Sequence, residues 1–244
     1  MFQVADFTHA VNAMEYDINE IRAHPLLRDV GEQSLQRALA AAVMSVFPRH
    51  ATLVSEGARC DLLYLLLEGT ATASSGHHGR ATTLFLLKPG AVFPLSSIVR
   101  NEVPLSTIST QGPVRVLMLP SATVRSLLRS DNDFCLAVLG AMARTSRDKT
   151  REIKNLKLRS STERVANWIH EAHRRTPKRR RLDLPTDKKT LALRLGMTPE
   201  NLARGFAHLR EFGVRVEGRT IWIEDPSALA RYADPTPLID ENQT

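Results

Sequence analysis

The sequence predicts an α+β protein in which a β-rich part is followed by a long helix and then by a small helical part that ends in a β-hairpin. Three observations support this order. Short runs of β-forming residues alternate with turn residues over 44–120. A helical pattern without proline then runs over about 131–160. Near the C-terminus, two short helical segments joined at Gly196 precede two strands of alternating polarity.

The β-rich part begins after a predicted helix. Leu35, Leu39 and Val43 recur at helical spacing and predict a helix over about 32–43. From residue 44 onward, glycines recur between short strands at positions 57, 69, 76, 79, 90 and 112, which is typical of a β-sandwich or a small barrel. The text SGHHG at 75–79 is a natural hairpin turn.

A long helix with one narrow apolar stripe is expected at about 132–157, after a short helix at 121–131. The stripe positions alternate in spacing between three and four residues, which is a heptad-like pattern; they are Leu139, Met142, Ser146, Lys149, Ile153 and Leu156. Such a stripe needs a partner along its length. Packing on the chain's own β-rich part is one alternative, and we favour a seam between two copies that also touches that part. Ser146 and Lys149 interrupt the stripe, so the seam is not a simple zipper.

Positive charge is concentrated in the C-terminal part. Residues 151–220 contain 18 Lys and Arg against 8 Asp and Glu, a net charge of +10, whereas the whole chain of 244 residues carries +7. The run HRRTPKRRR at 173–181 holds six basic residues, and its proline breaks any helix. A basic region on an otherwise acidic chain indicates a polyanion partner, usually nucleic acid. The run is either a solvated loop or a loop that contacts phosphates, and its place before the helical pair favours phosphates.

The two short helices have start and stop signals. Thr186 or Asp187 can cap the first helix, and Gly196 supplies a left-handed turn after it. Thr198 can cap the second helix, with Pro199 at its first position. The inward positions of the second helix are Leu202, Phe206 and Leu209. Two short helices joined by a glycine turn form a helix-turn-helix, whose second helix enters the major groove of DNA.

Base reading is assigned to the outward face of the second helix. Glu200 and Arg204 lie one turn apart on that face. Arg bonds guanine O6 and N7 with two donors, Glu accepts from cytosine N4, and Glu200 can also hold the Arg204 guanidinium in place without DNA. The alternative is an ordinary i,i+4 ion pair, which contributes only about 0.3 kcal/mol. Thr198 and Asn201 are further candidates for base contact.

A β-hairpin, or wing, follows the helix pair. The texts VRV and RTIWI alternate as strands, and Glu217-Gly218 makes a tight turn between them. The candidates for phosphate contact are Lys178, Arg179, Arg180, Arg181, Thr186, Lys188, Lys189 and Arg219. Residues 233–244 contain prolines, are net acidic and are expected to be loose.

With β-roll, long helix and winged helix-turn-helix in this order, the chain resembles the CRP/FNR family of bacterial transcription regulators over about 25–232. The family's β-roll pattern of glycine, acid, aromatic and glycine is met by Gly57, Asp61, Tyr64 and Gly69. GAVF at 90–93 is similar to the start of its effector-binding turn, and MTPENLAR at 197–204 to its recognition helix. Within the family the chain most resembles the NnrR/DNR group of nitrogen-oxide-responsive regulators, and the family resemblance implies half-sites of the TTG type. Ala203 stands where that group usually has serine, so we expect one DNA contact, and with it one base-pair preference, to differ from the group.

The resemblance implies a domain order and partners. The parts are an arm at 1–24, a cyclic-nucleotide-binding-like β-roll (jelly roll) at 25–130, a dimerisation helix at 131–160, a winged helix-turn-helix at 161–232 and a tail at 233–244. The partners are double-stranded DNA, a second copy of the chain and RNA polymerase, with activation and repression both left open. No apolar run reaches the roughly 18 residues that span a bilayer, and the start lacks a basic segment followed by an apolar one. We expect a cytoplasmic protein with no membrane partner.

The effector is less closely constrained. Family members that bind cyclic AMP carry Gly-Glu after the phenylalanine and an arginine about ten residues on, whereas this chain has Pro94-Leu95 after Phe93 and VPLST at 103–107. A buried cyclic phosphate would then lack its countercharge, which argues against cyclic AMP. Two cysteines are too few for the four-cysteine iron–sulfur cluster of the FNR type. An apolar ligand therefore fits better, in a pocket assigned to Phe93, Leu95, Ser96, Thr107, Lys149 and Thr150.

Likeness to the NnrR/DNR group makes haem that senses nitric oxide the leading candidate, with His24 or His50 as possible axial ligands. A packed roll without haem is the alternative. For the function as a whole, an alternative interpretation is a regulator that senses no ligand and is controlled by its abundance. A cupin-like enzyme is a further interpretation, which we do not favour because His77 and His78 in the β-rich text are adjacent, and neighbours on a strand point to opposite faces. No metal site is assigned.

Overall fold

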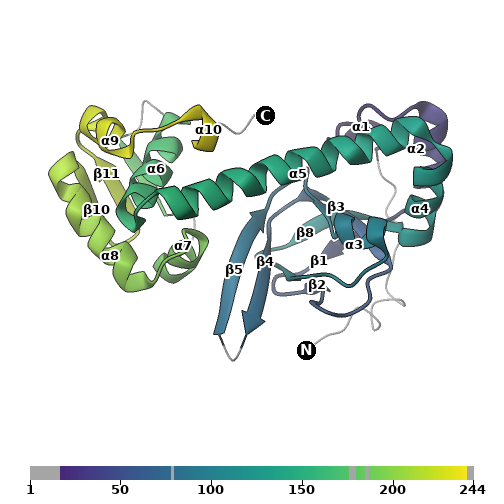
Figure 1. Cartoon of the computed structure of the whole chain (residues 1–244), viewed down its shortest axis with the longest axis horizontal. Helices are drawn as coiled ribbons and strands as arrows, with labels where there is room; N and C mark the ends of the chain where they lie inside the picture. The colour runs from purple at the N-terminus through teal and green to yellow at the C-terminus, as the bar shows by residue number, and fades with distance from the viewer. Residues whose placement is uncertain (1–16, 78–79, 176–179, 185–186, 241–244) are drawn as a thin grey trace. The chain divides into compact units, whose positions relative to one another are not determined.

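The computed structural model describes residues 17–77, 80–175, 180–184 and 187–240, and it divides the chain into two compact units, 1–145 and 146–244 (Figure 1). The predicted α+β class is confirmed. A single long helix, α5 (Asn132–Leu158), contributes residues to both units. Each unit is described below by itself.

The N-terminal unit is built on two four-stranded antiparallel sheets, in the orders β1-β8-β3-β6 and β2-β7-β4-β5. The strands are β1 (Val43–Phe47), β2 (Thr52–Val54), β3 (Leu62–Glu68), β4 (Ala71–His77), β5 (Arg80–Leu87), β6 (Val92–Phe93), β7 (Thr107–Thr110) and β8 (Val114–Pro120). The β4–β5 hairpin joins across residues 78–79, which lie outside the described part of the predicted SGHHG turn.

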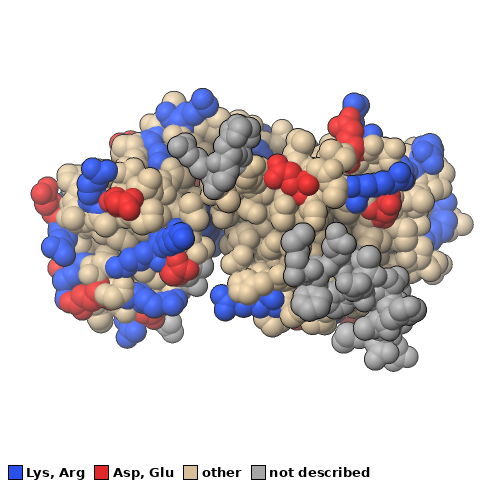
Figure 2. All heavy atoms as spheres, turned by 90° about the horizontal axis from the view of Figure 1, so that it is seen from below, with Lys and Arg blue, Asp and Glu red and all other residues tan. Residues whose placement is uncertain are grey.

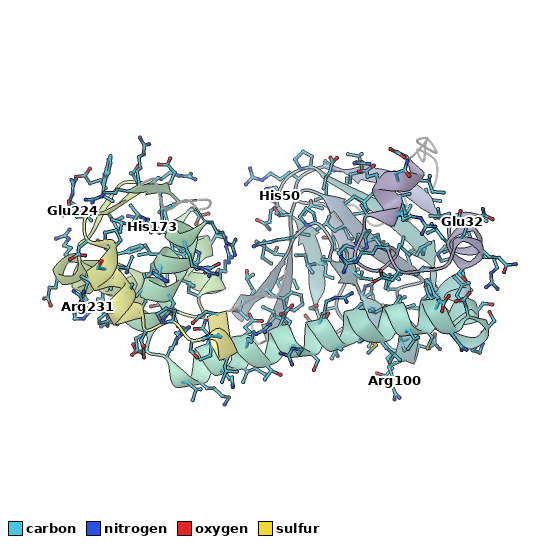
Figure 3. All side chains as sticks on the ribbon, turned by 90° about the horizontal axis from the view of Figure 1, so that it is seen from above. Glu32, His50, Arg100, His173, Glu224 and Arg231 are labelled. Carbon is cyan, nitrogen blue, oxygen red and sulfur yellow. The ribbon has the colours of Figure 1, made fainter. Side chains whose placement is uncertain are left out.

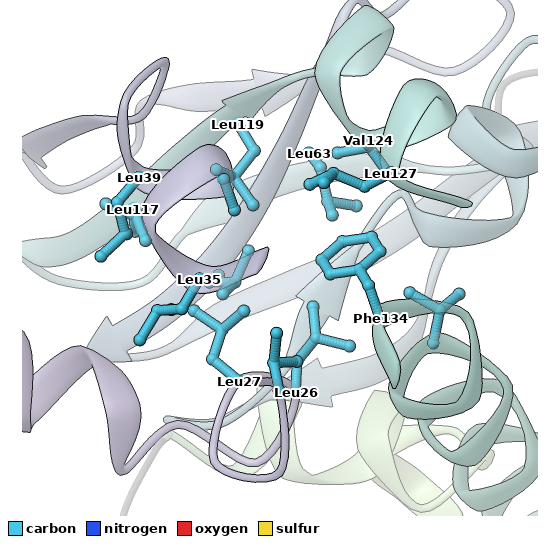
Figure 4. Close-up of a cluster of buried hydrophobic side chains, with 14 of the residues drawn as sticks. Leu26, Leu27, Leu35, Leu39, Leu63, Leu117, Leu119, Val124, Leu127 and Phe134 are labelled. Carbon is cyan, nitrogen blue, oxygen red and sulfur yellow. The ribbon is translucent and has the colours of Figure 1, made fainter. Parts of the chain in front are cut away.

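The apolar run of β3 is explained by burial on both faces of its sheet. Successive side chains of a strand point to opposite faces. Tyr64 and Leu66 pack between the two sheets, whereas Leu63 and Leu65 pack on the other side against helices. The unit thus has two cores, one between the two sheets and one, the helix-side core, between a sheet and the helices. Figure 4 shows the helix-side core, in which leucines from α2, β3 and β8 meet Val124, Leu127 and the ring of Phe134.

In the part of this unit that the structure describes, four short helices flank the sheets. They are α1 (Ile18–Arg22), α2 (Glu32–Leu39), α3 (Leu95–Arg100) and α4 (Ser121–Ser130). The predicted helix over 32–43 is four residues too long, because Val43 already pairs with Met118 as the first residue of β1. The predicted short helix at 121–131 is confirmed as α4. Helix α3 was not expected inside the β-rich text.

The long helix is confirmed, and only its first turns are buried in the roll. Asp131 accepts a hydrogen bond from the backbone N–H of Phe134 at 2.9 Å and so caps the start of α5. Phe134, Val138 and Ala141 are buried in the helix-side core. Farther along, the apolar side chains of the predicted seam stay open to solvent in the single chain, with Leu139 56% and Ile153 52% exposed.

The C-terminal unit combines short helices with a three-stranded antiparallel sheet of order β10-β11-β9. Its elements are α6 (Ser161–Arg174), β9 (Arg181–Asp183), α7 (Lys188–Arg194), α8 (Pro199–His208), the 3-10 helix η2 (Leu209–Phe212), β10 (Val214–Glu217), β11 (Thr220–Ile223), α9 (Pro226–Ala233) and α10 (Pro237–Asp240). One core around Val165, Ile169 and Phe206 is shared by these elements other than α10, which has no buried residue.

Two predictions for this unit are wrong. The run at 173–181 is not all loop, because Arg181 begins β9 and pairs with Trp222 of β11. The tail is not loose over its described part. Residues 237–240 form α10, and both carboxylate oxygens of Asp240 accept hydrogen bonds from the Arg159 guanidinium at 2.6 Å.

Candidate nucleic-acid interface

Helix α7 begins and ends at polar signals that the sequence carries. Asp187 is its N-cap, and the carboxylate accepts hydrogen bonds from the backbone N–H and the hydroxyl of Thr190, each at 2.8 Å. These bonds hold the pKa of the Asp187 carboxyl below its usual value. Thr186, the other predicted cap, lies outside the described residues. Gly196 follows the helix with φ +63°, a backbone conformation that glycine adopts without steric cost.

Helix α8 presents a polar row outward and an apolar row inward. Thr198 caps its start by accepting from the Asn201 backbone N–H at 3.3 Å, and Pro199 occupies the first turn. The predicted inward residues are all buried: Leu202, Phe206 and Leu209. Glu200 and Arg204 are exposed on the outward side, as expected from their spacing.

The Arg204 guanidinium is held by a different residue than expected. It donates a hydrogen bond to the side-chain oxygen of Asn201, three residues earlier, and no ion pair with Glu200 forms in the described structure. The pKa of Glu200 is held below its ordinary value mainly by a hydrogen bond to its own backbone N–H at the helix start, then by the Thr198 hydroxyl and, last, by the charge of Arg204. The two groups therefore stay separately available on the outer face.

The wing is present, with its turn one residue later than predicted. Glu217 pairs with Thr220, so Gly218 and Arg219 form the two-residue turn, and Gly218 has φ +58°. The exposed Arg219 is at this tip rather than at the base of the hairpin, and its guanidinium donates to the Leu184 carbonyl at 3.0 Å. Arg219 thus links the turn of the wing to Leu184, the residue that follows β9.

The predicted phosphate contacts other than Arg219 fall into three groups. Lys188 and Lys189 are exposed in the first turn of α7. Arg180 donates to the Glu224 carbonyl at 3.2 Å, and Arg181 pairs with Asp183 at 3.1 Å, so both are partly engaged within the unit. Lys178, Arg179 and Thr186 lie outside the described residues. One face of the unit, seen in Figure 2, carries basic side chains interspersed with acidic ones.

In the N-terminal unit, the residues predicted to line an effector pocket are mostly packed. The Phe93 ring stacks on Tyr64 with the ring centroids 5.3 Å apart, and both side chains are buried between the sheets. Leu95 is buried in the helix-side core, while Ser96 is exposed and Thr107 is partly exposed. Thr107 uses its hydroxyl to accept from the Glu56 backbone N–H at 3.1 Å.

The loop after α3 carries no inward arginine. Leu105 lies in this loop with 84% of its surface exposed. Arg100, the nearest arginine before the loop, extends away from the ribbon in Figure 3 and pairs with Glu102 at 3.1 Å. In the C-terminal unit, the remaining two predicted pocket residues bond within their own helix: Lys149 pairs with Glu152 at 2.9 Å, and the Thr150 hydroxyl donates to the Ser146 carbonyl at 3.0 Å.

His24 and His50 differ sharply in environment. His24 is buried, and its Nδ1 accepts a hydrogen bond from the Leu26 backbone N–H at 3.2 Å, which leaves the proton of the neutral ring on Nε2. Burial, together with the charge of Arg144, lowers the pKa of His24 to about 4. His50 is exposed (Figure 3). Among the described residues, no three His, Cys, Asp or Glu side chains gather as a metal site.

Sequence reasoning missed Arg164 and Asp240. Arg164 is buried on α6 and bonds to three backbone carbonyls, two of them at the end of α7. Its only signal in the sequence was its place directly after the capping box of Ser160 and Glu163, which starts α6. Asp240 bonds to Arg159 across 81 positions, so no local pattern marks it.

A double-sheet roll, a long helix and a helix-turn-helix with a wing define a DNA-binding regulator that carries a sensor-type domain. Comparison with known proteins gives the same order: residues 44–131 match the cyclic nucleotide-binding domain, and residues 163–232 match the Crp-like helix-turn-helix domain. The chain belongs to the CRP/FNR family of DNA-binding transcription regulators.

Individual relatives are moderately similar over most of the chain. The CRP-like cAMP-activated global transcriptional regulator of Mycobacterium tuberculosis is 26% identical over 223 residues, which cover 88% of this chain and all of the relative. A structure described as a proposed cAMP-binding regulatory protein from Silicibacter pomeroyi is 26% identical, covers 89% of this chain and 100% of its own, and has a TM-score of 0.58. A CRP/FNR-family structure from Eubacterium rectale shares the fold, with a TM-score of 0.70 at 19% identity, 86% of this chain and 98% of its own.

No helix in the described part of the chain has both the length and the apolar character needed to cross a bilayer.

Proposed function

We propose that the chain acts as a homodimer that reads an inverted-repeat DNA operator through helix α8. The observation that carries this proposal is the outward row of α8, where Glu200, Asn201 and Arg204 stand on a helix whose opposite side is buried. Arg204 suits a guanine edge and Asn201 an adenine edge, since each can make two hydrogen bonds to that base. Thr198 stands at the start of the same helix, where its hydroxyl can still donate to DNA.

Phosphate contacts fix the position of α8 in the groove without reading sequence. We assign them to Lys188 and Lys189 at the start of α7 and to Arg219 at the wing tip, with the basic run at 178–181 as a further set. The start of α7 and the tip of the wing are both exposed ends of their elements. Phosphates also favour the N-terminus of a helix, because its free N–H groups carry partial positive charge.

Dimerisation is assigned to α5. Leu139, Ile153 and Leu156 are exposed on the single chain at seam spacing, and Met142 is partly exposed. Leu139 and Met142 also line a groove of about 290 Å³ with Val99 of α3 and Leu128 of α4. The groove continues the apolar stripe, so the occupant we propose is the α5 helix of a second copy. Two recognition helices related by the dimer axis would then read half-sites about one DNA turn apart.

The effector in this proposal is a ligand other than cyclic AMP. Two relatives are named for cyclic AMP, so that ligand must be considered. Here Leu95 is buried where the family has its ribose-binding acid, and Leu105 is exposed in the stretch where its phosphate-binding arginine is expected. A cyclic phosphate in that place would have no countercharge from this loop, which is costly for a desolvated anion.

His24, the buried one of the two histidines expected as haem ligands, does not fit that role. An axial histidine bonds iron through one ring nitrogen and donates the N–H of the other to an acceptor. Nδ1 of His24 instead accepts from a backbone N–H, so its Nε2 carries the proton and has no free lone pair for iron. His50 is exposed. We therefore propose no step that depends on haem at either residue.

A regulator that needs no effector is the second candidate. The stacking of Phe93 on Tyr64 and the burial of Leu95 favour it, because a roll already filled by its own side chains has less room for a ligand. The two candidates differ in one observable, the change of DNA affinity on adding a ligand. We assign no catalytic activity to either.

The proposal is tested by fluorescence anisotropy with two labelled duplexes of equal composition, one a TTG-type inverted repeat and the other shuffled. We expect tighter binding of the inverted repeat, with one dimer per duplex and no gain on adding cyclic AMP. Equal affinity for several inverted repeats and for the shuffled duplex would contradict the assignment of sequence reading. A large rise in affinity with cyclic AMP would contradict the effector argument alone.

A further inference from the structure

The C-terminal unit contains a buried cation, the guanidinium of Arg164, that no carboxylate of the described residues neutralises. Arg164 is 9% exposed. Its Nε donates to the Leu195 carbonyl at 2.9 Å, one terminal nitrogen donates to the Gly196 carbonyl at 3.2 Å, and the other donates to the Arg159 carbonyl at 2.7 Å. In the described residues it makes no ion pair, and burial lowers the pKa of its guanidinium.

Burial of the Arg164 guanidinium away from any described carboxylate costs free energy, which its hydrogen bonds must offset. Moving a charge out of water without a countercharge is unfavourable, and here three carbonyls must compensate. Two of them, the carbonyls of the C-cap Leu195 and of Gly196, come directly after the last turn of α7. A helix C-terminus carries unpaired carbonyls and partial negative charge, so Arg164 satisfies both the geometry and the charge of that end.

The carbonyls that Arg164 bonds lie in two places, the turn between α7 and α8 and the junction between α5 and α6. Leu195 and Gly196 form the turn between α7 and α8, and α8 begins only three residues after Gly196. Arg159 lies between the end of α5 at Leu158 and the start of α6 at Ser161. One side chain therefore ties the turn before the recognition helix to the junction between α5 and α6.

Both ends of this tie are fixed by further contacts. The Arg159 side chain is 8% exposed and bonds Asp240 of α10 through two nitrogens at 2.6 Å. A Cβ added to Gly196 would lie 2.5 Å from Cδ2 of Leu156, so the turn packs directly on the last part of α5. The contacts run from Asp240 through Arg159 and Arg164 to Gly196 without a gap.

We propose that Arg164 is a positioning residue for DNA reading, which sets the direction of α8 by fixing the α7–α8 turn to the α5–α6 junction. The inference rests on the proposed function of α8. Arg164 touches no base; it acts through the carbonyls of Leu195 and Gly196. Asp240 supports it from the other side by holding Arg159, so the C-terminal helix α10 is part of the same support.

The test compares Arg164→Lys with Asn167→Ala as a matched control. Asn167 is a buried polar residue on the same helix, and it donates to the Glu163 and Ala233 carbonyls at 2.9 and 2.6 Å. It ties α6 to α9 and touches neither the turn nor the junction. Both variants lose buried hydrogen bonds and should unfold at a lower temperature, but only Arg164→Lys alters the support of α8. Lysine keeps the charge and loses the planar set of donors.

Two readouts separate positioning from general stability. For Arg164→Lys we expect at least tenfold weaker binding of the specific duplex, less than threefold weaker binding of a shuffled duplex, and faster hydrogen–deuterium exchange over 191–205 in the free protein. For Asn167→Ala we expect the ratio of the two affinities and the exchange over 191–205 to stay as in the wild type. Asp240→Asn should change the ratio in the direction of Arg164→Lys, by a smaller factor.

The inference is overturned if Arg164→Lys leaves the affinity ratio and the exchange over 191–205 unchanged, or if both variants change them equally. If the wild-type protein shows no sequence preference at all, the proposed function fails. The exchange measurement then still decides whether Arg164 fixes the turn.

Discussion

The guanidinium of Arg204 donates a hydrogen bond to the side-chain oxygen of Asn201, three residues earlier on the exposed face of α8. Asn201 thereby orders the arginine before DNA arrives, a role that the spacing had suggested for Glu200. An ordered guanidinium loses less side-chain entropy on binding than a free one. The pair also places two base-reading side chains next to each other, so their effects on binding should be coupled.

Arg204→Ala should weaken binding of the specific duplex by roughly 1–3 kcal/mol and relax the preference at one base pair in each half-site. The reason is the loss of a two-donor contact to a guanine edge. Anisotropy on a set of single-base operator variants measures this. Arg210→Ala is the matched control, since Arg210 is an exposed arginine on η2 and outside the proposed reading face. An equal loss on specific and random DNA for Arg204→Ala would show that Arg204 contacts only phosphate.

Replacing both Lys188 and Lys189 by Gln should weaken binding of all duplexes by a similar factor. Each lost phosphate contact should also reduce the slope of log K against log salt by about 1. Titrations at several salt concentrations give the slope. A change of base preference without a change of slope would move these lysines from the phosphate set to the reading set.

Leu139→Asp or Ile153→Glu should convert the dimer to a monomer, because either change buries a carboxylate in the proposed α5 seam. Light scattering across a dilution series gives the molecular mass. Leu158→Asp serves as the control, because Leu158 is exposed near the end of the same helix and lies outside the seam spacing. Wild-type protein that is monomeric at micromolar concentration would remove the basis for an inverted-repeat operator.

Acidification should destabilise the N-terminal unit through His24. The folded protein protonates His24 only near pH 4, whereas an unfolded chain does so near 6.5. Between these values the unfolded state binds more protons, so the free energy of unfolding falls as the pH falls through this window. The full effect is on the order of 3 kcal/mol, from a shift of pKa from 6.5 to about 4.

His24→Asn tests this origin of the pH dependence, because its side-chain oxygen can accept from Leu26 but takes up no proton in the window. We expect chemical unfolding curves of this variant to depend much less on pH between 6.5 and 4. His50→Asn is the control and should keep the wild-type dependence, since His50 is exposed and asparagine tolerates its φ of +64°. An unchanged slope in His24→Asn would place the titrating group elsewhere.

Local signals in the sequence made helix α8 predictable. Gly196, Thr198 and Pro199 each act within a few residues of their own position, and the structure has the turn and the cap where they predict them. The alternating strands of the wing were also recognisable, although pairing of Glu217 with Thr220 moved the turn by one residue.

Features that depend on distant partners were not predictable from the sequence. Arg181 reads as part of a basic loop, and only its pairing with Trp222 makes it a strand residue. Asp240 sits in a proline-containing tail, and only Arg159 gives that tail a fixed place. Arg164 directly follows the capping box that Ser160 and Glu163 form, and its three carbonyl partners become visible only when α6 and α7 are packed.

The central claim is that a dimer of this chain reads an inverted repeat through Glu200 and Arg204. Selection of bound duplexes from a random pool, followed by sequencing, tests it most directly. The account predicts enrichment of two inverted half-sites whose centres lie about 10 base pairs apart, with the motif weakened at one symmetric pair of positions when Arg204→Ala is used. Enrichment of a single half-site or a direct repeat, or an identical motif from wild type and Arg204→Ala, would contradict it.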